Sequence, residues 1–246
     1  MALVPPDPAA GPLAQSEQPL CKPEHCFHAF DALYCALTGA DPIPPQFPDD
    51  KFPLFVTWNT RSSRPGRAPR LRGCIGNFEA QPLRSGLAEY ALISAFRDHR
   101  FRKIEERELS SLECIVSLLT DFEDASSYLD WTIGVHGISI TFPHPSTLLS
   151  APSSDAPSPL SSAASLLTSK FSSKSTFSAT YLPQVAPEQG WDKVETIDSA
   201  IEKAGWGGRV SEDLRRSVKV RRYQSQTSLV GWDEYVEWRR GRGGAM

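Results

Sequence analysis

A cysteine between two glycines is the feature of this sequence best suited to chemistry. Gly73 and Gly76 flank Cys74 within the hexapeptide Leu-Arg-Gly-Cys-Ile-Gly at residues 71–76. Glycines allow a substrate to approach the backbone closely, and they leave the thiol unshielded by neighbouring side chains. Once ionised, a thiol can act as a nucleophile. One hypothesis is therefore a thiol-dependent enzyme that uses Cys74.

Four further polar residues could complete such a site. Arg72 could lower the pKa of the thiol or hold an anion, and His136, in a His-Gly turn, could accept a proton. Asp98 and Arg100, in an Asp-x-Arg-Phe segment, could orient partners. Helix or strand periodicity does not explain these side chains, so we expect all four to converge with Cys74 on one partly exposed cleft. Arg72 should then lie near a carboxylate, because an unpaired buried guanidinium is costly.

A structural role competes with catalysis. An isolated cysteine in a β-type segment is usually a small buried hydrophobe, and Arg72 could simply pair with Asp98 or Glu79. We favour this interpretation over a catalytic thiol. The same segment could instead form a ligand-binding cleft for a small molecule or a protein. The sequence does not identify a cofactor. The candidate binding residues are Arg72, Gly73, Gly76, Asp98 and Arg100.

A group of cysteines and histidines near the N-terminus raises the question of metal. Thiolate and imidazole are the usual zinc ligands, and four such residues stand close together at Cys21, His25, Cys26 and His28. Apolar residues recur at helical spacing through residues 25–37, however, and no second Cys/His pair follows downstream. We therefore predict an amphipathic helix and no metal site.

The elements that position these residues follow from hydrophobic periodicity. Helical spacing predicts helices at residues 25–37, 82–97, 196–204 and 233–240. Branched and aromatic runs predict strands at 54–58, 71–78, 114–120 and 217–223, with a further strand or hairpin at 131–142 around His136. We expect these strands to pair antiparallel.

Amino-acid composition divides the chain into a tail, a domain and an insertion within that domain. Residues 1–22 lack periodicity and are predicted to form a disordered tail before a domain at 23–240. Residues 143–175 are rich in Ser, Pro and Ala, with too few large apolar side chains to offset the entropy of ordering. We predict a disordered insertion there, which the fold should tolerate losing.

The net charge limits how this protein could bind nucleic acid. A formal charge of −3 excludes nucleic-acid binding driven by a general positive field, so any such contact must be local. Residues 209–242 hold nine basic against five acidic residues, and Lys219 and Arg221 share a strand face with Tyr223. This pattern leaves open an RNA- or protein-binding regulatory module, against the simpler interpretation of a charged edge strand.

The predicted compartment is the cytoplasm, the nucleus or both. The N-terminal residues lack the basic and unbroken apolar regions of a signal peptide, and no stretch approaches the length that spans a membrane. Five cysteines without an export signal indicate reduced thiols.

The hexapeptide at residues 71–76 reproduces the LRGCIG signature of the AMMECR-one domain family. Further segments support this resemblance in the right order: Pro-Leu-Phe-Val-Thr-Trp at 53–58, Gly-Val-His-Gly-Ile at 134–138 and Ala-Thr-Tyr-Leu-Pro at 179–183. The likeness runs from about residue 24 to residue 235 and indicates a fungal-like member. It departs from the family at the Ser/Pro-rich insertion, where the connection is usually much shorter.

The resemblance implies an α+β fold, with antiparallel sheets flanked by helices and a cleft between a larger and a smaller lobe. No activity is firmly established for the family. Similar prokaryotic domains occur fused to or beside Memo-like proteins and radical-SAM enzymes. That association implies a Memo-like partner and redox or metal-linked chemistry as further hypotheses.

Overall fold

One antiparallel sheet organises the protein. The computed structural model describes residues 19–62, 66, 68–144 and 176–244. Six strands pair in the order β2-β1-β3-β6-β4-β5. Their bounds are β1 (Lys51–Thr60), β2 (Arg70–Pro82), β3 (Leu112–Asp124), β4 (Gly137–Pro143), β5 (Thr176–Tyr181) and β6 (Lys219–Gly231). The predicted α+β class with antiparallel pairing is confirmed, with a single curled sheet in place of several.

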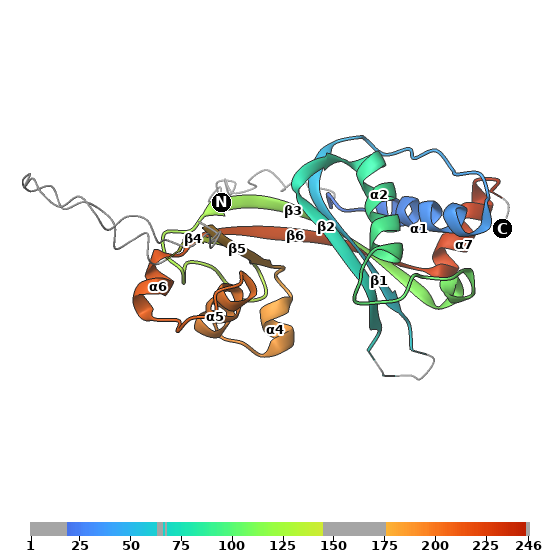
Figure 1. Ribbon diagram of the computed structural model, residues 1–246. Helices are drawn as coiled ribbons and strands as arrows, with labels where there is room; N and C mark the ends of the chain where they lie inside the picture. Colours follow the sequence, from blue (N-terminus) through green and yellow to red (C-terminus); the bar gives the residue numbers. More distant parts are fainter. Residues whose placement is uncertain (1–18, 63–65, 67, 145–175, 245–246) are drawn as a thin grey trace, which may run out of the picture.

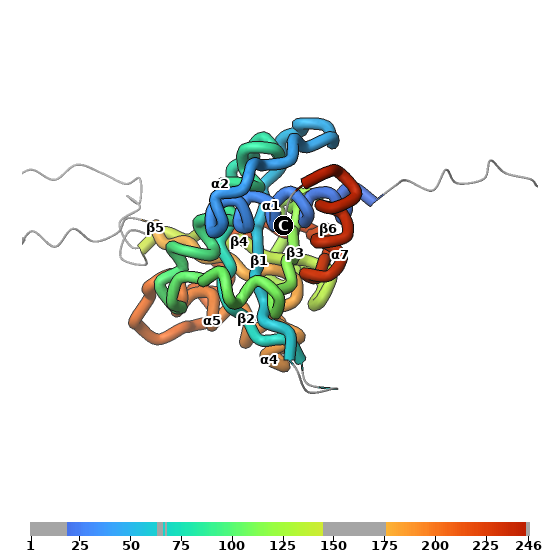
Figure 2. Tube along the Cα trace, turned by 90° about the vertical axis from the view of Figure 1, so that its right-hand side faces the viewer, coloured from blue at the N-terminus to red at the C-terminus, as the bar shows by residue number. Residues whose placement is uncertain are grey.

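Two sets of helices pack on this sheet at opposite ends. The first set is α1 (Pro23–Thr38), α2 (Leu83–Phe96) and α7 (Trp232–Gly241), and the second is α4 (Val185–Gln189), α5 (Lys193–Lys203) and α6 (Glu212–Ser217). A short 3-10 helix, η1 (Glu106–Ser111), precedes β3. The first set lies above the strands at one end, and the second lies below them at the other end (Figure 1). The view along the sheet separates α1 and α2 from α4 and α5 in the same way (Figure 2).

The larger core lies under α1 and α2. Leu54, Val56 and Trp58 alternate along β1 and are fully buried, as strand periodicity predicts. The indole N–H of Trp58 donates to the carbonyl of Ala91 in α2, so a buried polar atom is satisfied where strand and helix meet.

The smaller core lies between the other end of the sheet and α5. Ile138 and Ile140 of β4 pack there with Ile197 and Ile201 of α5. Val220 of β6 belongs to this core, whereas Val230 of the same strand belongs to the larger one. The twist of a long strand turns one side toward helices on opposite faces. β6 therefore contributes to both cores.

Two segments differ from the predicted strands. Residues 131–135 form a turn, closed where His136 and Val135 donate backbone N–H groups to the carbonyl of Thr132. Trp131 anchors that turn in the smaller core, which explains its apolar character without a strand. β6 continues eight residues beyond Tyr223, because the polar segment that follows pairs along β3.

The predicted insertion lies mostly outside the described residues, which stop at 144 and resume at 176. The strands on either side are paired, with Pro143 of β4 opposite Thr176 of β5. Deleting residues 146–174 would therefore join two ends that already lie side by side. We expect the melting temperature to change by less than about 4 °C, because shortening the connection between two paired strands alters the closure entropy little. Thermal unfolding followed by circular dichroism checks this, and a loss of 10 °C or more would contradict it.

Candidate functional site

Cys74 lies in the middle of β2, opposite Thr57 of β1. The Thr57 hydroxyl donates to the thiol sulfur at 3.0 Å, and the Cys74 side chain is half-buried. Burial raises the pKa of this thiol above its ordinary value, although the Thr57 hydrogen bond and Arg100 oppose the change. The thiol therefore stays protonated near neutral pH and is a poor nucleophile.

Asp98 and Arg100 join Cys74 through its backbone. Asp98, 6% exposed, accepts the Cys74 backbone N–H at 2.9 Å and two hydrogen bonds from the Arg100 guanidinium at 2.9 and 2.7 Å. The Arg100 guanidinium also donates to the Cys74 carbonyl at 3.1 Å. These bonds, chiefly those from Arg100, lower the pKa of Asp98 to about 2 despite its burial. The structure thus brings three of the predicted site residues together.

Arg72 lies near a carboxylate, as expected, but that carboxylate is Glu108. Its guanidinium makes a bidentate pair with Glu108 at 2.8 and 3.1 Å and also donates to the carbonyls of Arg102 and Lys103. Neither Asp98 nor Glu79 is its partner. The guanidinium uses four hydrogen bonds within the protein, two of them to hold the backbone of residues 102–103. Few of its N–H donors are left for a ligand.

Gly73 and Gly76 allow neighbouring parts of the protein to approach the β2 backbone closely. A Cβ atom on Gly73 would lie 2.2 Å from the backbone oxygen of Ser94 in α2. A Cβ on Gly76 would lie 2.3 Å from the backbone oxygen of Leu54 and equally close to the Phe55 ring. The close approach is therefore made by the protein itself, and the glycines allow strand and helix to pack.

His136 is not joined to this cluster. Its Nδ1 accepts the backbone N–H of Thr132 at 2.9 Å, within the turn that precedes β4. Strands β1, β3 and β6 lie between β2 and β4 in the sheet. The hydrogen bonds described for His136 are thus local, and no Cys74–His136 pair is formed among them.

A groove of about 990 Å³ lies beside the cluster, between the loop end of the β1–β2 hairpin, where β1 ends at Thr60 and β2 begins at Arg70, and the segment that carries residues 100–108. Seven basic residues and two acidic residues line it. The basic residues are Arg61, Arg70, Arg72, Arg100, Arg102, Lys103 and Arg107. This local excess of positive charge contrasts with the net charge of −3 of the whole chain.

The cations of this basic groove are unequally neutralised. Arg61 pairs with Asp233 and Arg107 with Glu105, in addition to the pairs of Arg72 and Arg100. Among the residues that the structure describes, Arg70, Arg102 and Lys103 have no ion pair, and all three are exposed.

Sequence reasoning missed Arg102 and Lys103. The signal in the sequence was the run Arg-Phe-Arg-Lys at 100–103, in which three basic residues flank one aromatic residue along the chain.

The basic C-terminal strand is not organised as predicted. Tyr223 is fully buried, stacked on Phe122, so its ring is unavailable to a base. Arg222 is held by Glu123 and Asp130 at 2.8 and 2.7 Å. The rings of Phe78 and Phe122 both pack against Tyr223, and this aromatic contact accounts for its burial.

The four candidate metal ligands near the N-terminus are engaged separately. The thiols of Cys21 and Cys26 donate to the carbonyls of Val116 and Ser228, and His28 contacts the carbonyl of Arg84. Within residues 19–62, 66, 68–144 and 176–244, no group of three or more Cys, His, Asp or Glu side chains is placed to hold a metal ion. The same part of the chain contains no helix long and apolar enough to cross a membrane.

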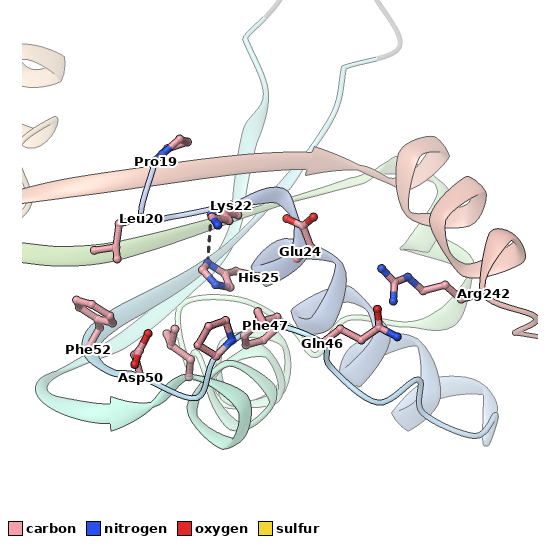
Figure 3. Close-up of a pocket in the computed structure, with 12 residues that line it drawn as sticks. Pro19, Leu20, Lys22, Glu24, His25, Gln46, Phe47, Asp50, Phe52 and Arg242 are labelled. Atoms are coloured by element: carbon pink, nitrogen blue, oxygen red, sulfur yellow. Dashed lines mark hydrogen bonds between the residues drawn. The ribbon is translucent and has the colours of Figure 1, made fainter. Parts of the chain in front are cut away.

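A second cavity, of about 390 Å³, lies at the first turn of α1 (Figure 3). His25, 3% exposed, borders it and accepts the backbone N–H of Lys22 at 3.2 Å. Burial lowers the pKa of His25, so its ring is neutral near pH 7. Charges of both signs surround the opening, from Lys22 and Arg242 on one hand and from Glu24 and Asp50 on the other. This cavity has no net preference for an anion or a cation.

Comparison with known proteins shows which family the chain belongs to. A family model described as AMMECR1 matches residues 26–158 and 160–228. The chain belongs to the AMMECR1 family. It is 41% identical over 215 residues to an uncharacterized protein of Arabidopsis thaliana, which covers 87% of each chain. It is 32% identical over 205 residues to an uncharacterized protein of Saccharomyces cerevisiae, which covers 76% of this chain and 71% of that protein.

The fold also matches a solved structure. The crystal structure of an uncharacterized protein from Pyrococcus horikoshii superposes with a TM-score of 0.59 at 25% sequence identity. The match covers 83% of this chain and 89% of the archaeal chain. These similarities establish the family and the fold, and a fold alone does not determine a function.

Proposed function

We propose that this AMMECR1-family protein is a binding module whose ligand is single-stranded RNA, held in the basic groove. The observation that carries the proposal is a set of three exposed cations in the groove, which make no ion pair with the residues that the structure describes: Arg70, Arg102 and Lys103. Each cation that neutralises a phosphate releases condensed counterions, which supplies binding free energy independent of sequence. The net charge of the chain limits such binding to a local basic surface, and this groove is one.

Several features favour RNA over an acidic protein as the ligand. Six of the seven basic lining residues are arginines, whose planar guanidinium suits phosphate and can stack on a base. Phe101 and Leu71 also line the groove and add apolar surface to it, and Leu71 is 37% exposed. A carboxylate-rich peptide would use the charges but would leave this apolar surface uncovered.

A thiol-dependent enzyme is less consistent with the site. The pKa of Cys74 is raised by burial, and His136 is engaged in its own turn. A reactive cysteine needs the opposite: a lowered pKa and an adjacent base. The Asp98–Arg100 pair instead holds the backbone on both sides of Cys74 and thereby fixes one border of the groove.

The direct test is RNA binding by a groove variant. We expect R102Q/K103Q to bind a fluorescein-labelled 12-mer of oligouridine about ten-fold more weakly than the wild type. The slope of log affinity against log salt should also fall by about 1.4, because each lost phosphate contact contributes about 0.7 in single strands. Fluorescence anisotropy at several NaCl concentrations measures both quantities.

A matched control removes the same charge elsewhere. Arg209 and Lys219 are exposed basic residues of the smaller lobe, inside the segment 209–242 that the sequence singled out. R209Q/K219Q should leave affinity and salt slope close to those of the wild type. Equal losses of RNA affinity in the two double variants would refute the proposal that RNA binds in the groove. A wild-type protein that binds a polyglutamate peptide but not RNA would also refute it.

A further inference from the structure

His25 brings an enclosed hydrogen-bond donor to the cavity at the first turn of α1. Its Nδ1 accepts the backbone N–H of Lys22, so the proton of the neutral ring lies on Nε2. Within the part of the chain that the structure describes, Nε2 has no hydrogen-bond partner, although the residue is only 3% exposed. Figure 3 shows Nδ1 toward Lys22 and the rest of the ring turned toward Phe47, Asp50 and Phe52. A donor so enclosed is stabilised by an acceptor that enters the cavity.

The cavity wall that faces His25 is held in place by α2. Arg84, in the first turn of α2, donates from its guanidinium to the Phe47 carbonyl at 3.2 and 2.9 Å. The backbone N–H of Arg84 donates to the Asp49 carboxylate at 2.8 Å. The Phe47 ring meets the His25 ring edge to face, with 4.7 Å between the ring centres. These contacts fix the shape of the cavity before a ligand arrives, which lowers the entropic cost of binding.

A second buried donor belongs to Trp238 of α7. Its indole N–H has no hydrogen-bond acceptor among the described residues. Trp238 borders a smaller cavity of about 20 Å³, which has Glu24, Gln46, Phe47 and Arg242 in common with the larger one. That volume is enough for one water molecule. Each of these two adjoining cavities is therefore lined by a residue whose ring N–H lacks an acceptor in the described protein.

The lining of the larger cavity determines the kind of molecule that fits. Its volume of about 390 Å³ lies in the range of small-molecule sites. Apolar side chains form much of the wall, and they suit a flat ring: Leu20, Phe47, Phe52 and Leu83. Two basic and two acidic residues balance one another at the opening, so a net charge on the ligand brings no advantage. The ligand must nevertheless carry polar groups that match His25 and the carboxylates.

We propose that this cavity binds a small, uncharged nitrogen heterocycle of the nucleobase type. A ring carbonyl of the ligand accepts from Nε2 of His25, and a ring N–H donates to the Asp50 carboxylate. Such a compound combines apolar faces with acceptors and donors along its edge, which is the combination that the lining offers. The cavity shares no lining residue with the basic groove, so this proposal does not depend on RNA binding there.

Two substitutions of His25 separate the roles of its two nitrogens. In H25N the amide oxygen takes the place of Nδ1 and can accept from Lys22, but no donor remains at Nε2. In H25Q the longer side chain places an amide N–H near Nε2 and loses the acceptor. We expect H25N to bind uracil about ten-fold more weakly than the wild type, and H25Q to stay within about three-fold of it. Chemical shifts of backbone amides in ¹H–¹⁵N NMR titrations measure the affinity, and the signals that move should be those of cavity residues.

A second probe tests the contact with Asp50. 1,3-Dimethyluracil keeps both carbonyl groups of uracil and lacks its N–H donors. The wild type should prefer uracil, and D50A should lose this preference. Thermal unfolding of H25N and H25Q checks that both variants fold, and H25Q should be the less stable because it loses the bond to Lys22.

Three results would overturn the proposal: no saturable shift changes with uracil in the wild type, equal affinities of H25N and the wild type, or equal losses in H25N and H25Q. R102Q/K103Q should bind uracil like the wild type, which separates this result from the outcome for the basic groove.

Discussion

Replacing Gly73 or Gly76 with valine should destabilise the protein by about 3 kcal/mol or more, since overpacking typically costs about 1–3 kcal/mol and here the obstacle is backbone. At Gly73 the new side chain would meet the Ser94 carbonyl of α2, and at Gly76 it would meet the Leu54 carbonyl. Neither oxygen can move without separating a strand from its neighbour or from its helix. Urea unfolding followed by circular dichroism measures the change.

Cys74→Ser is the control, because it lies between the two glycines and changes the reactive atom. The serine side chain fits the same space, and its hydroxyl can exchange a hydrogen bond with Thr57. We expect a loss of only about 1 kcal/mol. If all three substitutions were equally tolerated, the packing role assigned to the glycines would be wrong.

Arg239→Met should be among the most destabilising substitutions outside the sheet. The Arg239 guanidinium pairs with the Asp31 carboxylate, and the two side chains are 2% and 1% exposed. Asp31 also accepts from Tyr235 at 2.9 Å and from the backbone N–H of Ile43 at 2.7 Å. Removing the cation would leave a buried carboxylate uncompensated, which costs about 3–5 kcal/mol. Thermal and urea unfolding both measure this loss.

An exposed ion pair provides the comparison. Arg61 and Asp233 join the end of β1 to α7 at 3.2 Å, but the Asp233 side chain is 80% exposed. Arg61→Met should change stability by less than about 1 kcal/mol, as surface pairs generally do. If Arg239→Met cost no more than Arg61→Met, the buried pair would not link α1 to α7 as we infer. Replacing both Asp31 and Arg239 with apolar residues should recover part of the loss.

Local chemistry made some site residues readable in the sequence. Asp98 and Arg100 stand two residues apart outside any periodic pattern, and they do form a pair beside Cys74. The partner of Arg72 was not readable, since Glu108 is 36 residues away and reaches it through the fold. Pairing across such a separation depends on where the segment after α2 returns to β2, which no local signal encodes.

The sequence by itself determined the family, the antiparallel α+β class and the approximate positions of most helices and strands, because these depend on periodicity and short motifs. Tertiary structure alone decided that Gly73 and Gly76 accommodate neighbouring backbone, that Tyr223 turns inward and that His136 stays in its own turn. It also decided which cations remain unpaired, because burial and pairing depend on contacts between residues far apart along the chain.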